Sequence, residues 1–243
     1  MKKIFFFFIA LLFISIAQAQ NIPVTNPNAV NLPVAKNLPV ALYSPPSVTI
    51  VNEPGQPLYN QTWMQKNLNV TTYRNGDPIP EVKDSVEWSK LTTGAWCYYK
   101  NDPAYGKIYG KLYNWYAVYD PRGLAPAGWH IPSDVEWTAL SNGLGGEGVA
   151  GGKMKVLGES YSSGKWSAPN EGATNSSGFS GWPGGYRLHD SRFSNVRLQG
   201  HWWSSTDFSL EEARSRQLNY YQSKIFRESK EKQDGLSVRC IKD

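Results

Sequence analysis

The side chains best suited to thiol or imidazole chemistry in this chain are Cys97 and Cys240, together with His130, His189 and His201. A zinc site usually takes four such ligands, and at least two of them stand a few residues apart. Because the cysteines are far apart and the histidines are scattered, we expect no resident transition metal. His130, in "GWHIP", comes just before a helix start and is better explained as a structural residue.

Hydrolytic chemistry has little support. A nucleophilic serine must lie beside a histidine, yet no Gly-x-Ser-x-Gly motif occurs, and "SSGFSG" is typical of a loop. A glycosidase needs two carboxylates about 5–10 Å apart, and the spacing of the acids singles out no such pair. The acids considered are Glu136, Glu147, Glu159, Glu171 and Asp207. A hydrolase of unknown type is therefore only the third choice of function.

Aromatic residues are the richest source of binding chemistry, because the chain has ten tryptophans and 14 tyrosines. Their flat faces and polar edges suit sugar rings and protein anchors alike. The candidate ligand-binding residues are Trp166, Trp182, Tyr186, Arg187 and Trp202. The alternative is that most of the rings pack in the core. Since neighbouring side chains of a strand point to opposite faces, we expect Trp203 to lie in the core and Trp202 to lean toward the loops.

The two cysteines have a second interpretation. In an oxidising compartment an even number of cysteines indicates disulfides, and a Cys97–Cys240 bond would close a very long loop. By the chain-entropy argument, such a bond stabilises a fold by about 4–5 kcal/mol. The alternative is two buried free thiols.

The clearest structural element is a helix in "HIPSDVEWTALSNGLGG". Ser133 stands three residues before Glu136, the spacing of a capping box in which each side chain bonds the other residue's amide. Val135, Trp137 and Leu140 are expected to form the buried side of this helix.

The rest of the chain indicates an α+β fold with small antiparallel sheets. A second short helix is expected over 112–119, where large residues recur at helical spacing. Alternating residues predict strands near 59–73 and, toward the end, in "HWWSST", "ARSRQLNYY", "SKIFRES" and "GLSVRCIKD". The last of these is expected to be half-buried. Between 143 and 200, recurring glycines predict long ordered loops.

Composition divides the chain into three parts. Residues 1–19 have the two lysines, apolar run and Ala-Gln-Ala site of a secretory signal peptide. Residues 20–57, with "NLPVA" twice, predict a proline-rich extended tether, whose apolar residues can instead lie on the domain or on a partner. Residues 58–243 have the length of one domain. The formal net charge of +5 is mild and mixed with acids, which does not favour nucleic acid. No later apolar run approaches a membrane span.

Six ordered blocks in the predicted domain point to one family. They read "WMQKNL", "YGKLYNWYAV", "RGLAPAGWHIPSDVEWTAL", "SGFSGWPGGYR", "WWSST" and "GLSVRCIKD". Over residues 58–243 the chain thereby resembles the Fibrobacter succinogenes major paralogous domain family. The resemblance implies a C-type-lectin-like fold, distantly similar to formylglycine-generating enzyme domains, with two short helices, small twisted antiparallel sheets and long glycine-rich ordered loops. It implies a secreted or surface location in Bacteroidetes-type bacteria and no established reaction.

The resemblance also bears on the candidate sites. It implies that the first and last strands lie together, which would allow Cys97 and Cys240 to meet. Formylglycine-generating chemistry needs a close thiol pair, and this chain has no second cysteine near Cys240. That activity is therefore not expected.

Calcium is a further possibility that the resemblance raises. Lectins of this fold hold calcium with an acid-Pro-Asn loop and a Trp-Asn-Asp strand, whereas the chain reads "SAPNEGATN" and "WWSSTD". Both motifs are altered, so we expect no cofactor. If calcium does bind, the expected ligands are Asn170, Glu171 and Asn175. Otherwise the Asn and Thr side chains hold their own loop.

We therefore expect a non-catalytic binding module, secreted to the periplasm or outer surface of a Gram-negative bacterium. Its ligand would be a glycan or a cell-surface protein. The alternative is a structural or assembly subunit that docks through its proline-rich leader.

Overall fold

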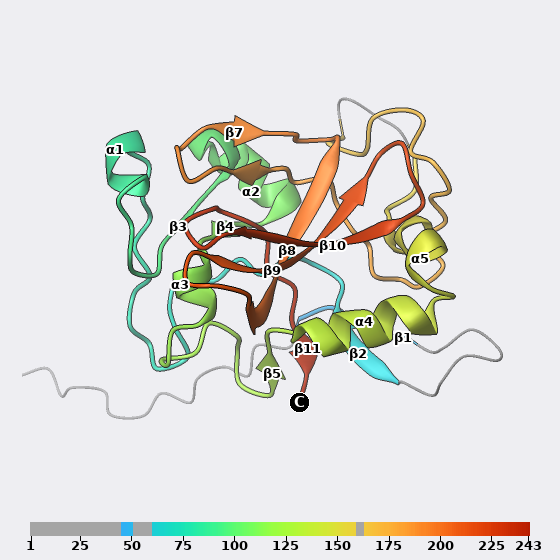
Figure 1. Cartoon of the computed structure of the whole chain (residues 1–243), viewed down its shortest axis with the longest axis horizontal. Helices are drawn as coiled ribbons and strands as arrows, with labels where there is room; N and C mark the ends of the chain where they lie inside the picture. Colours follow the sequence, from blue (N-terminus) through green and yellow to red (C-terminus); the bar gives the residue numbers. More distant parts are fainter. Residues whose placement is uncertain (1–44, 51–59, 159–162) are drawn as a thin grey trace, which may run out of the picture. The chain divides into compact units, whose positions relative to one another are not determined.

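Three long strands near the end of the chain form a central sheet. The computed structural model describes residues 45–50, 60–158 and 163–243. The strands are antiparallel, in the order β10-β9-β8 (Figure 1): β8 (Gln199–Asp207), β9 (Glu212–Asn219) and β10 (Ile225–Glu231). This sheet confirms the predicted meander. The alternation of side chains within each segment had indicated all three strands.

Two helices pack against one face of this sheet: α4 (Asp134–Gly143) and α5 (Glu147–Met154). The helix α5 was not predicted from the sequence, because it has three glycines in eight residues. Close packing explains two of these glycines. A Cβ on Gly151 would lie 2.5 Å from Lys224 O, and one on Gly152 would lie 2.3 Å from Gly172 O. The glycines therefore let α5 approach neighbouring backbone that any side chain would displace.

The start of α4 has the predicted capping box. Ser133 Oγ accepts a hydrogen bond from the Glu136 amide, and the Glu136 carboxylate accepts one from the Ser133 amide (2.7 Å). Trp137 and Leu140 are buried as expected, but Val135 is 76% exposed. Val135 stands two residues before Trp137, which is about 200° around a helix, so the two side chains cannot share a face.

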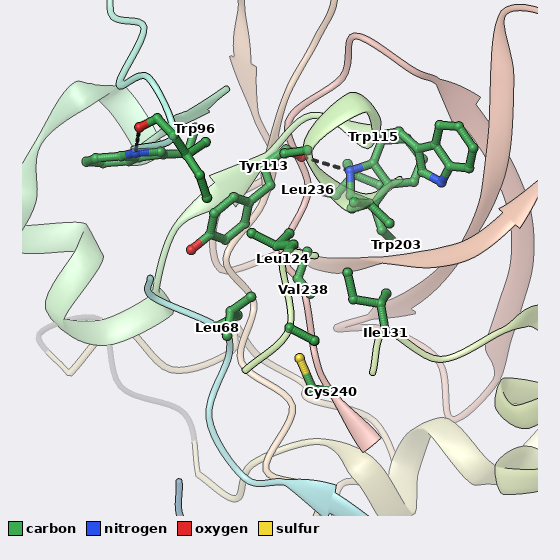
Figure 2. Close-up of a cluster of buried hydrophobic side chains, with 14 of the residues drawn as sticks. Leu68, Trp96, Tyr113, Trp115, Leu124, Ile131, Trp203, Leu236, Val238 and Cys240 are labelled. Carbon is green, nitrogen blue, oxygen red and sulfur yellow. Dashed lines mark hydrogen bonds between the residues drawn. The ribbon is translucent and has the colours of Figure 1, made fainter. Parts of the chain in front are cut away.

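The adjacent tryptophans of β8 lie on opposite faces, and both are buried. Trp202, 1% exposed, packs in one cluster with Trp137, and its Nε1 donates to Asn67 Oδ1 (2.8 Å). Trp203, 0% exposed, lies in a second cluster, and its Nε1 donates to Tyr113 O (2.8 Å; Figure 2). The prediction that Trp202 leans toward the loops is wrong because both faces of β8 are covered.

The terminal segment, residues 235–240, is an inner part of the fold. It lies beside β8, where the Ser237 amide donates to His201 O (3.1 Å), and its Leu236 exchanges backbone hydrogen bonds with Tyr113. Leu236 lies in the same core cluster as Trp203 (Figure 2). All six residues are buried, so the prediction of a half-buried strand is wrong. Alternation identified the core-facing side, but the opposite side is covered too.

A second sheet joins the start and the end of the described domain. Its order is β1-β2-β11-β5: β1 (Ser47–Ile50), β2 (Gln61–Met64), β11 (Ile241–Lys242) and β5 (Trp129–His130). All three pairings are antiparallel. The first and last strands therefore lie in one sheet, as the family resemblance implied.

Strand β1 belongs to the stretch expected to be a tether. Its Ile50 is 4% exposed and packs in the cluster that contains Trp63. The prediction of a tether is therefore wrong for Ser47–Ile50, and the alternative, apolar leader residues on the domain, holds there. The predicted signal peptide and residues 20–44 and 51–57 of the leader lie outside the described residues. Among the described residues, no helix has the length and hydrophobicity needed to cross a membrane.

The remaining elements are short. The helices are α1 (Ser85–Trp88), the 3-10 helix η1 (Tyr99–Asn101), α2 (Pro103–Tyr109) and α3 (Trp115–Val118). The two-stranded sheets pair β3 (Trp96–Cys97) with β4 (Leu112–Tyr113) and β6 (Tyr186–Arg187) with β7 (Phe193–Ser194). The helix expected over 112–119 is confirmed only for 115–118. The domain is thus a mixed α+β fold of small antiparallel sheets and short helices.

The predicted disulfide is wrong. Cys97 and Cys240 are free, buried thiols in different hydrophobic clusters, Cys97 with Trp88 and Cys240 with Val238. Burial raises the pKa of each thiol to about 12, so both are protonated at neutral pH. The pairing was inferred from cysteine count, which contains no information on distance. The alternative of two buried thiols is the observed one.

Candidate functional site

Three of the predicted ligand-binding residues are part of the core. Trp166 donates its Nε1–H to Gly181 O (3.0 Å), and Trp202 is buried as described above. Arg187 lies 4.2 Å from the ring centroid of Trp88 and donates to Val82 O (2.7 Å). These side chains present no free surface to a ligand, so their prediction as binding residues is corrected.

The other two predicted residues, Trp182 and Tyr186, are half-buried but have different neighbours. The Trp182 ring meets Tyr109 edge to face at 6.4 Å. The Tyr186 ring lies 4.6 Å from the ring of His201 on the central sheet. The structure therefore does not bring the five predicted residues into one site.

Tyr186 lies in a cluster of polar side chains on one face of the central sheet, which we call the sheet-face network. Cross-strand register places the inner members together, since His201 is paired with Gln217, and Ser215 with Glu228. Side chains of directly paired residues share a face. The members of the sheet-face network are Tyr186, Asn195, Gln199, His201, Gln217, Glu228 and Lys230.

Hydrogen bonds run through the sheet-face network in one direction. Gln199 Oε1 accepts a hydrogen bond from Asn195 Nδ2 (2.7 Å) and lies within hydrogen-bond distance of His201 Nε2 (3.0 Å). With the Gln217 amide turned so that both of its ends have partners, its oxygen accepts from Gln199 Nε2 (2.9 Å) and its nitrogen donates to Glu228 Oε2 (3.1 Å). Each amide thus accepts on one side and donates on the other, ending on the carboxylate of Glu228.

The histidine at the centre of this network is neutral. Burial, with Lys230 nearby, holds the pKa of His201 well below its ordinary value. Because its Nε2 faces an accepting amide oxygen, Nε2 carries the hydrogen and Nδ1 has a bare lone pair. His201 Nδ1 has no hydrogen-bond partner among the described residues.

The accessible rim of the network combines a ring with charged groups. Lys230 Nζ lies 5.1 Å from the Tyr186 ring centroid and 3.7 Å from Glu228 Oε2. Tyr186, Glu228 and Lys230 are all half-buried, so their outer atoms are open to solvent. A flat ring beside fixed donors and acceptors is suited to binding a polyhydroxylated molecule.

A chain of aromatic side chains lies along α2 and the β6–β7 hairpin. Neighbouring ring centroids are 5.2 to 6.4 Å apart, the range of favourable aromatic pairs. Its members, in order, are Trp182, Tyr109, Tyr105, Tyr99 and Phe193. Tyr99 and Tyr109 are buried and the other three are half-buried. This aromatic row therefore supports the hairpin that carries Tyr186.

The loop considered for calcium is held by its own side chains. Asn175 Oδ1 accepts from the Ser180 amide (2.8 Å), and Asn170 Nδ2 donates to Val156 O (3.1 Å). The buried Lys155 ammonium donates to the backbone oxygens of Glu171 (2.7 Å) and Asn219 (2.9 Å). The Asn175 side chain thus bonds the backbone of its own loop and the Asn170 side chain bonds Val156, whereas Glu171 is held through its backbone carbonyl and not through its carboxylate.

His130 has the expected structural role, between two carboxylates. Its Nδ1 lies 2.7 Å from Asp243 Oδ1, and its Nε2 lies 2.9 Å from Glu136 Oε1. Burial lowers the pKa of His130, but the hydrogen bonds to Glu136 and Asp243 outweigh it, so the pKa is raised. The imidazole thereby links the start of α4 to Asp243, the residue that follows β11.

We expect this link to weaken as pH rises. A histidine with a raised folded pKa stabilises the fold below its unfolded pKa of about 6.5, and the contribution is lost as pH rises through the folded pKa. The loss should be below about 1 kcal/mol because the pair is partly exposed. Urea unfolding of the protein and its His130→Gln variant at about pH 6 and about pH 8 measures it. Equal pH dependence in both proteins would contradict the expectation.

Most residues of the sheet-face network were not predicted from the sequence. The usable signal was polar residues at alternate positions of the predicted strands, such as Ser215 and Gln217. Alternation identifies a polar face on each strand. The meeting of His201, Gln217 and Glu228 depends on the register between strands, which the strand patterns do not contain.

The protein is thus a mixed α+β domain with small antiparallel sheets, an aromatic core and one polar face on its central sheet. The chain belongs to the family described as the Fibrobacter succinogenes major domain (Fib_succ_major), whose model matches residues 58–242. No curated protein and no solved structure matches the chain.

Proposed function

We propose that the protein is a secreted or cell-surface, non-catalytic module that binds a glycan through the sheet-face network without calcium. The observation that carries the proposal is the half-buried Tyr186 ring, which lies against His201 and under Lys230, beside a directed chain of amides that ends on Glu228. Sugar rings bring apolar C–H faces and hydroxyl groups together, and this rim offers a partner for each.

The directed hydrogen bonds give the site a fixed orientation before any ligand arrives. Gln199 and Gln217 hold each other in place, and Gln217 holds the Glu228 carboxylate. A pre-ordered rim loses little entropy on binding, which favours recognition of a small polar ligand. A carboxylate acceptor beside an ammonium donor suits two neighbouring hydroxyls, because hydrogen bonds to charged groups are stronger than neutral ones.

A C-type-lectin-like fold and an extracytoplasmic location belong to the same proposal. The adjacency of β2, β11 and β5 supports the fold, because that fold holds its first and last strands together. The signal-peptide pattern of residues 1–19 supports secretion to the periplasm or the outer surface.

Glycan-array binding, repeated with a chelator, tests the proposal. We expect binding to be unaffected by the chelator and to weaken about tenfold in a Tyr186→Ala variant, since the loss of one ring contact costs about 1.4 kcal/mol. Tyr221→Ala is the matched control, because Tyr221 is also a surface tyrosine (51% exposed) but packs on Tyr220, outside the sheet-face network. Absence of glycan binding, or equal loss in both variants, would count against the proposal.

A further inference from the structure

Strand β1 occupies a shaped position on the domain, which we call the β1 site. It is formed by the edge of β2 and by Gly178. Ile50 enters the core, and Val48 Cγ2 lies 3.0 Å from the point where a Cβ on Gly178 would be. The Gln65 amide donates to Pro46 O (2.8 Å), which extends the pairing beyond Ser47–Ile50. The missing side chain at Gly178 therefore makes room for a β-branched residue of the leader.

The connection between β1 and β2 is long for neighbouring antiparallel strands. Residues 51–60 separate Ile50 from Gln61, which are paired directly. Hairpin connections usually have about 2–5 residues. Ten residues span up to about 35 Å when extended, so the leader of one molecule can reach the β1 site of a neighbouring molecule.

The free edge of β1 has none of the features that protect edge strands. Ser47–Ile50, "SVTI", contains no charged residue and no proline, and no strand pairs with its outer edge among the described residues. Proteins usually place such residues on edge strands to prevent pairing between molecules. This edge is therefore compatible with assembly.

We propose that two copies of this chain exchange β1, so that the leader strand of each copy occupies the β1 site of the other in a two-fold dimer. The exchanged strand makes the same contacts as in a single copy, so exchange loses no interaction of the β1 site. The long connection supplies the reach, and the fit of Val48 at Gly178 supplies the specificity. The inference is independent of the glycan proposal, because no residue of the sheet-face network takes part.

Cysteine cross-linking tests the exchange directly. Thr49 and Thr62 are paired across β1 and β2, and their Oγ1 atoms are 3.0 Å apart. We expect a mixture of the Thr49→Cys and Thr62→Cys proteins, co-expressed and oxidised, to give a mixed covalent dimer on a non-reducing gel. The double variant should also give covalent dimers. The native protein is the background control, because its own two thiols are buried. Cross-links only within one chain of the double variant, or none in the mixture, would overturn the proposal.

A glycine pair provides a second, matched test. Gly178 (φ +70°) and Gly128 (φ +77°) have similar backbones, but only Gly178 has Val48 beside it. We expect Gly178→Ala to lower the yield of the mixed Thr49–Thr62 cross-link at least tenfold, because it weakens the β1 site whichever copy fills it, and Gly128→Ala to leave that yield unchanged. A monomeric native protein at tens of micromolar, or equal effects of the two variants, would overturn the proposal.

Discussion

Replacing Trp203 by alanine should lower the free energy of unfolding by about 3–5 kcal/mol, the range for a large aromatic residue removed from a core. The Trp203 ring is fully buried in the cluster with Leu236 and Val238 (Figure 2). The change leaves a cavity between β8 and the terminal segment, and it leaves Tyr113 O without its indole donor. Both effects destabilise the native state only.

Thermal and urea unfolding followed by circular dichroism measure this effect. At about 2–4 °C per kcal/mol for a domain of this size, the melting temperature should fall by about 6–20 °C. Trp182→Ala is the control, because its ring is half-buried and the change should cost clearly less. A loss below about 1 kcal/mol for Trp203→Ala would contradict the core assignment.

Replacing Asp134 by alanine should cost a similar amount, about 3–5 kcal/mol, because it leaves a buried guanidinium without its counter-ion. Asp134 Oδ1 lies 2.7 Å from Nη1 of Arg216, whose side chain is 2% exposed. Arg216 also donates to Asp134 O (3.0 Å) and Thr138 Oγ1 (3.1 Å), so the pair joins β9 to the first turn of α4. Loss of the carboxylate therefore weakens the contact between helix and sheet.

The same carboxylate predicts a loss of stability in acid. Burial raises the pKa of Asp134, but hydrogen bonds from Arg227 and Arg216 outweigh it, so the pKa is lowered. A carboxylate with a lowered folded pKa stabilises the fold above its unfolded pKa of about 3.9, and the contribution is lost as pH falls through the folded pKa.

The Asp134→Ala variant should therefore be less sensitive to acid than the native protein. Arg227→Ala is the control, because that partner is 45% exposed and exposed pairs contribute about 0–1 kcal/mol. Equal losses in Asp134→Ala and Arg227→Ala would show that burial of Arg216 is not the cause.

Several features were predicted because their causes lie within a few residues. The capping box needs only Ser133 and Glu136 at the right spacing. The strands of the meander are indicated by the alternation of side chains within each segment. The helix α5 was missed because its glycines oppose helix formation locally. They are tolerated where Gly151 and Gly152 contact distant backbone.

The candidate site was predicted in part only. Tyr186 was chosen for its type and position, and it is a rim residue of the sheet-face network. Arg187, the next residue, is buried on the opposite face of the hairpin, with Trp88 and Phe193. Residue type does not distinguish the two, because exposure depends on which segment covers each face.

The chain alone was sufficient for the capping box, for the strands of the meander and for family membership, because capping, alternation and motif order are properties of neighbouring residues. Only the folded structure showed that Trp202 is buried, that the two thiols are apart and that the leader strand pairs with β2. Burial, thiol separation and strand pairing all depend on which distant segments meet. For Ser47–Ile50 that segment is β2, ten residues further along, and for His201 it is β9, whose register with β8 creates the sheet-face network.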